Sequence, residues 1–106
     1  MGEILKRARE AKPPRAALQY EQDELRLLVS LCRELQREAG DKPFYLSGRT
    51  AAAQIGVSPR HAATWLKGLV IDGILKLAKA GDRRKREANE YRFVANTRRT
   101  QGGSDA

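Results

Sequence analysis

The chain has 106 residues and a formal net charge of +8 at pH 7. That length allows one compact domain and is too short for an enzyme with separate cofactor and substrate domains. The single cysteine excludes a disulfide within the chain. The sequence has no signal-peptide pattern and no apolar run near the roughly 20 residues of a membrane span. We therefore expect a cytoplasmic protein, nucleoid-associated if bacterial, with no membrane association.

The positive charge lies outside one segment. Residues 21–40 carry five acids and three bases, so the rest of the chain carries a net charge of +10. A sequence pI near 10.2 favours polyanionic partners. A face turned toward phosphate and an acidic face turned away would explain this asymmetry. A basic protein with ordinary solvated surfaces would show the same composition.

Residues 1–20 are predicted to form a basic N-terminal arm. Ile4, Leu5 and Ala8 fall on one side of a short helix, which would be marginal alone. Pro13 and Pro14 end that helix and favour extended backbone before the next element.

A long helix is predicted from about residue 21 to residue 39. Its apolar residues recur at helical spacing: Leu25, Leu28, Val29, Cys32 and Leu35. Leu27 and Leu31 widen the apolar arc to roughly 200°, broader than a single core-facing stripe. The helix should therefore bury a second side, against the arm or against another copy of itself. The second alternative predicts a homodimer through this helix.

The middle of the chain carries clear signals for helix starts and turns. Residues 43–46 read as a short extended segment, and Ser47 then caps a helix over 48–55. Gly56 supplies a tight turn that calls for a positive φ. Ser58 is a second cap, and Pro59 occupies the favoured first position of a helix over 59–72.

Two short strands are predicted near the end of the chain, over 74–79 and 90–94, joined by a polar tip at 81–89. The apolar pattern stops at residue 95, so we expect a disordered tail over 95–106. The predicted fold class is therefore α+β, mainly α with a small β-hairpin.

This order of elements, with a basic loop between the last two strands, resembles the winged helix-turn-helix family. The match centres on residues 50–66, where Ala52 is the small residue four positions before Gly56 and Val57 is the aliphatic residue after it. The run over 69–75 resembles the exit from the recognition helix into the wing. The resemblance covers residues 21–94 and implies a three-helix core plus a wing.

The resemblance also implies how DNA would be bound. The helix over 59–72 would enter the major groove, and the wing at 81–89 would lie on the backbone or in the minor groove. Arg60 would then contact guanine, and Thr64 a thymine methyl or a phosphate. The candidate residues are Ser58, Pro59, Arg60, His61, Ala63, Thr64 and Lys67 on the helix, Arg83, Arg84, Lys85 and Arg86 in the wing, and Arg49 as a backbone contact.

Several residues that suggest other chemistry are better explained structurally. His61 is the only histidine, and with the distant Cys32 it cannot supply the three or four ligands of a metal site. Glu34 and Glu38 lie on a charged helix side, without the shielded pocket that general acid–base catalysis needs. The sequence therefore predicts no catalysis, metal, cofactor or small-molecule ligand.

The leading hypothesis is sequence-specific or semi-specific binding of double-stranded DNA. The role would be that of a small transcriptional regulator, or of an accessory module in a replication or mobile-element protein. The alternative is a winged-helix module for protein–protein assembly that binds no nucleic acid. RNA binding is a weaker hypothesis, because exposed aromatic residues for base stacking are scarce.

Overall fold

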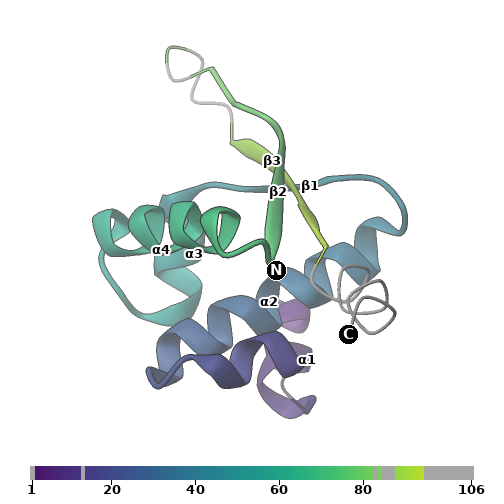
Figure 1. Ribbon diagram of the computed structural model, residues 1–106, viewed down its shortest axis with the longest axis vertical. Helices are drawn as coiled ribbons and strands as arrows, with labels where there is room; N and C mark the ends of the chain where they lie inside the picture. Colours follow the sequence, from purple (N-terminus) through teal and green to yellow (C-terminus); the bar gives the residue numbers. More distant parts are fainter. Residues whose placement is uncertain (1, 13, 83, 85–87, 95–106) are drawn as a thin grey trace.

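The computed structural model describes residues 2–12, 14–82, 84 and 88–94. Within these residues the chain forms four α-helices, one 3-10 helix and three strands (Figure 1). In chain order they are α1 (Gly2–Glu10), η1 (Arg15–Gln19), α2 (Asp23–Ala39), β1 (Phe44–Leu46), α3 (Gly48–Ile55), α4 (Pro59–Ile71), β2 (Leu75–Lys79) and β3 (Asn89–Phe93). The predicted α+β class is confirmed. The predicted tail over 95–106 lies outside the described residues.

The strands form one antiparallel sheet in the order β1-β3-β2. The predicted hairpin of β2 and β3 is present, and β1 adds a third strand on the other edge of β3. Because side chains alternate across a strand, one face of the sheet carries the buried residues Phe44, Leu46, Leu75, Tyr91 and Phe93. Leu77 belongs to this face but is 42% exposed, because the hairpin projects beyond the helices (Figure 1).

Helix α2 forms the centre of the core. Leu28, Val29 and Cys32 on this helix are completely buried. Burial raises the pKa of the Cys32 thiol, which keeps the sulfur protonated and a weak nucleophile. Cys32 is therefore a core residue, as the sequence predicts.

The second apolar side of α2 is covered by the N-terminal segment. Both α1 and η1 contact α2, and their residues Ala8 and Ala17 are 3% and 0% exposed. The wide apolar arc predicts that either the N-terminal arm or another copy of the chain covers this side of α2. In the structure, the arm covers it. Residues of the predicted arm thus belong to the same hydrophobic cluster as the rest of the core.

Glu34 differs from the expectation that it lies on an open charged side of its helix. It is 3% exposed and accepts hydrogen bonds from Arg33 at 3.2 Å and Arg37 at 3.0 Å. A buried carboxylate requires such partners, because its desolvation is costly. The expectation was wrong because packing around α2 buries Glu34, while two arginines of the same helix supply its hydrogen bonds.

Gln36 joins three segments of the fold. Its Oε1 accepts a hydrogen bond from the backbone N–H of Phe93 at 2.8 Å. Its Nε2 donates to the carbonyl oxygens of Gly40 at 2.9 Å and Lys42 at 2.7 Å. One amide therefore holds the end of α2, the loop before β1, and β3 together.

We expect Gln36→Ala to lower the free energy of unfolding by about 2 kcal/mol, because it leaves the part-buried Phe93 N–H without its partner. Urea denaturation measures this change. Gln19→Ala is the matched control, since Gln19 makes one exposed hydrogen bond within η1 and should cost less than about 0.5 kcal/mol. Equal losses in the two variants would contradict the role assigned to Gln36.

Candidate nucleic-acid interface

Helices α3 and α4 each begin at the serine cap that the sequence predicts. Ser47 Oγ accepts a hydrogen bond from the backbone N–H of Thr50 at 3.0 Å. Ser58 Oγ accepts one from the backbone N–H of His61 at 3.1 Å. Each cap satisfies a donor that a helix start leaves unpaired, so both helices have defined first turns.

The turn between these helices is fixed by Gly56. Its φ is +79°, the left-handed region that glycine adopts without strain. The N–H groups of Gly56 and Val57 both donate to the carbonyl oxygen of Ala52, at 2.9 and 3.2 Å. The predicted positive φ is therefore confirmed, and it sets the direction in which α4 leaves α3.

The start of α3 lies directly against α4. A Cβ added to Gly48 would sit 3.2 Å from the Cβ of Ala63, tighter than ordinary van der Waals contact. Glycine at this position allows the two helices to approach. Arg49, the next residue along α3, is exposed.

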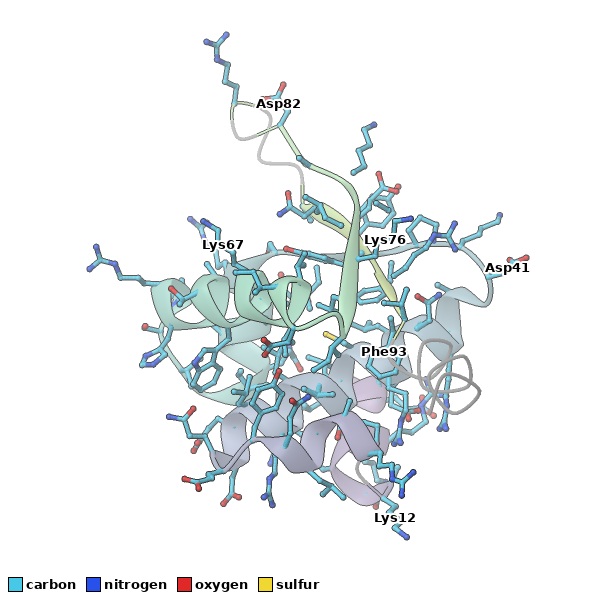
Figure 2. The ribbon with its side chains drawn as sticks, viewed as in Figure 1. Lys12, Asp41, Lys67, Lys76, Asp82 and Phe93 are labelled. Carbon is cyan, nitrogen blue, oxygen red and sulfur yellow. The ribbon has the colours of Figure 1, made fainter. Side chains whose placement is uncertain are left out.

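One side of α4 is anchored in the core. Ala62, Leu66 and Leu69 are at most 2% exposed. At about 100° per residue, the exposed side chains opposite them form a line, here called the α4 stripe: Arg60, Thr64, Lys67 and Ile71. Figure 2 shows Lys67 on the upper side of α4, the direction in which the hairpin also extends.

The other candidate residues of α4 flank this stripe. Pro59 and Ala63 are exposed on one flank, and Ser58 and His61 on the other. The imidazole ring of His61 meets the indole ring of Trp65 edge-on, with ring centroids 4.9 Å apart. Trp65 is half-buried and packs against the edge of the core.

Thr64 has a more limited hydrogen-bonding capacity than the sequence suggests. Its hydroxyl donates to the carbonyl oxygen of Arg60, one turn earlier, at 3.0 Å. That hydrogen is therefore not free for a phosphate. The methyl group and the remaining oxygen lone pair are what this exposed side chain offers to a partner.

The hairpin of β2 and β3 extends away from the helices (Figure 1). Figure 2 shows Asp82 near its far end, where the Asp82 carboxylate accepts a hydrogen bond from the backbone N–H of Arg84 at 2.9 Å. Arg84 is exposed. The other three candidate residues of the wing, Arg83, Lys85 and Arg86, lie outside the described residues.

The segment of the chain that contains the α4 stripe is strongly basic. Residues 42–81 contain six lysines and arginines and a single acid, Asp72. The Asp72 carboxylate accepts a hydrogen bond from the hydroxyl of Tyr20 at 2.6 Å, and burial together with this bond raises the pKa of Tyr20. The one acid of this region therefore serves to hold the end of α4 to the N-terminal segment.

Ile71 is a member of the stripe that sequence analysis missed. Its side chain is 78% exposed, although the run over 69–75 suggests only an apolar exit from the helix. Ile71 lies eleven residues after Arg60, and on a helix this spacing puts the two side chains on the same side. That spacing could have identified Ile71 from the sequence.

The described part of the chain contains no group of three or more metal-ligating side chains, and none of its helices has the length and apolar character needed to span a bilayer. Comparison with protein-family models, with curated proteins and with solved structures found no match for this chain.

Proposed function

We propose that this protein binds double-stranded DNA, with α4 in the major groove. The observation that carries the proposal is the α4 stripe, exposed on the side opposite a firmly buried one. An α-helix of 13 residues is about 20 Å long and fits a groove roughly 12 Å wide. In finer terms, we propose a winged helix-turn-helix, with α2, α3 and α4 as its core and β2 and β3 as its wing.

The three polar residues of the stripe have distinct roles in this proposal. The Arg60 guanidinium donates two hydrogen bonds to one guanine, which gives sequence preference. Thr64 presents its methyl group to a thymine, and Lys67 neutralises a phosphate. Arg49 contacts the backbone, and the basic tip of the wing follows the backbone or enters the minor groove.

The biological role that we propose is that of a small transcriptional regulator. An accessory DNA-binding module in a replication or mobile-element protein would use the same interface.

Fluorescence anisotropy of a random-sequence duplex, titrated with this protein at several salt concentrations, tests the proposal. Contact with about five to seven phosphates predicts a slope of log affinity against log salt of roughly −5 to −6. Such a slope would justify selecting a target from a random pool. Absence of binding even at low salt would overturn the proposal.

Exposed apolar side chains support the alternative of a protein–protein assembly module. Leu18 and Ile71 are 54% and 78% exposed, and large apolar side chains in contact with solvent are common at such interfaces. In that case affinity for a protein partner would change little with salt, and duplex DNA would not compete for the surface.

A further inference from the structure

The sheet has a second face, which carries mostly charged residues and which no helix of the described residues covers. Strand alternation puts Tyr45, Lys76, Glu90 and Arg92 on this face, and a register shift between Leu77 and Lys79 brings Lys79 opposite Glu90. These five residues are here called the outer sheet face. Glu90 pairs with Tyr45 on one side and Lys79 on the other, and Lys76 pairs with Arg92 in the next row. Figure 2 shows Lys76 on the side of β2 away from α4.

Two features of this face are unfavourable for stability alone. Lys76 and Arg92 are directly opposite each other across the strands, and like charges in that position destabilise a sheet. The Arg92 guanidinium donates a hydrogen bond to the backbone carbonyl oxygen of Asp41, a neutral group that does not cancel its charge. The aromatic ring of Tyr45 belongs to a side chain that is 66% exposed. An anion between the cations and a flat ligand on the ring would compensate for both.

A hollow of about 280 Å³ lies beside the Tyr45 ring. Its lining residues are Tyr45, Lys79, Gly81, Ala88 and Glu90. The shape of its wall is held by Asn89, whose Oδ1 accepts a hydrogen bond from the Gly81 N–H at 2.7 Å. Asn89 Nδ2 in turn donates to the hydroxyl of Tyr91 at 3.1 Å. The hollow thus combines an aromatic surface, a cation and a carboxylate.

We propose that the outer sheet face binds single-stranded nucleic acid, with one base stacked on Tyr45. A base in the hollow places its exocyclic amine against the Glu90 carboxylate, which can only accept hydrogen bonds when ionised. Lys79 binds the adjacent phosphate. Lys76 and Arg92, one row away at about 7 Å along the strands, bind the next phosphate.

Charge and chemistry select this occupant. Three of the five side chains are cationic, and an exposed aromatic ring beside cations is how proteins hold unpaired bases and their backbone. A paired base inside a duplex does not offer its flat face, so this surface is separate from the α4 stripe in chemistry as well as in position. The inference does not rest on the proposed duplex binding.

Fluorescence anisotropy of labelled oligocytidines of about ten nucleotides, one of DNA and one of RNA, tests the inference. Tyr45→Ala should weaken binding about 5- to 150-fold, the range that stacking of one base corresponds to. Tyr45→Phe is the matched control, because it keeps the ring and should retain most of the affinity. Both variants alter an exposed side chain, and far-UV circular dichroism and thermal unfolding would verify that they fold.

Lys76→Glu separates a binding role from a structural one. The new carboxylate would pair with Arg92, so the protein should be at least as stable as the parent chain. Affinity for the single strands should nevertheless fall at least about fivefold, because a phosphate contact becomes a repulsion. A variant that is as stable and binds as tightly as the parent would contradict the inference.

The outcomes distinguish this inference from the proposed function. Tyr45→Ala should leave duplex affinity unchanged, and single strands should still bind even if duplex binding proves absent. Binding of DNA alone, RNA alone or both identifies the source of the strand and supports the inference. Single-strand affinity that is absent at low salt, or equal in the parent and Tyr45→Ala, would overturn it.

Discussion

Replacement of Arg60 and Lys67 together by alanine is expected to weaken duplex DNA binding by roughly 30- to 1,000-fold. Loss of a bidentate contact to guanine costs about 1–3 kcal/mol, and loss of a phosphate contact adds to it. Both side chains are exposed and lie opposite the buried side of α4, so the double variant should fold with the stability of the parent.

The two single variants should fail in different ways. Arg60→Ala should relax discrimination at one or two base pairs of a selected target, while Lys67→Ala should weaken all sequences alike and lower the salt slope by about one. Anisotropy with the selected target and with its point-substituted versions measures both effects. Identical behaviour of the two variants would contradict the assigned division of roles.

A matched control removes the same charge elsewhere. Lys12 and Arg15 are exposed cations of the N-terminal segment, and Figure 2 shows Lys12 at the end of the molecule remote from the hairpin. Replacing both by alanine should reduce affinity only slightly, through the change in net charge. A loss as large as that of the Arg60 and Lys67 variant would mean that duplex binding is diffuse and does not use α4.

Sequence patterns were most informative where local interactions decide the structure. The two serine caps, the positive φ of Gly56 and the bounds of α3 all depend on residues a few positions apart, and all were predicted. The buried side of α2 followed equally well from its period. Periodicity reports which side of an element is apolar, whatever that side later packs against.

Features made by residues far apart in the chain were not predictable. Pairing of Phe44 with Tyr91 makes β1 the third strand, and neither segment specifies the other. The bridging role of Gln36 and the burial of Glu34 likewise depend on what surrounds α2. Sequence analysis found exposed aromatic residues scarce, but only the strand register reveals that Tyr45 stands on the open face of the sheet.

What covers the wide apolar arc of α2 also depends on residues far apart in the chain. The pattern predicts a second covered side, yet it cannot tell an intramolecular cover from a second copy of the chain. In the structure, α1 and η1 occupy that side. A homodimer through α2 would therefore have to use the surface that they leave exposed, or displace them.

Ala17→Glu tests that cover and is expected to lower the free energy of unfolding by about 3 to 5 kcal/mol. Ala17 is completely buried at the contact of η1 with α2, and an unpaired charge forced into such a position is among the most costly substitutions. Chemical denaturation of the variant and the parent measures the difference. That loss is a large part of the total stability of a small domain.

Leu18→Glu is the matched control. Leu18 is next to Ala17 in the chain, but its side chain is 54% exposed, so this position should tolerate the same charge within about 0.5 kcal/mol. If η1 detaches in Ala17→Glu, the apolar arc of α2 becomes accessible, and sedimentation at tens of micromolar should show self-association that the control lacks. Equal stability of the two variants would mean that η1 is not docked in solution. The second side of α2 would then be open to another copy, and a dimer of the parent chain would be the expected state.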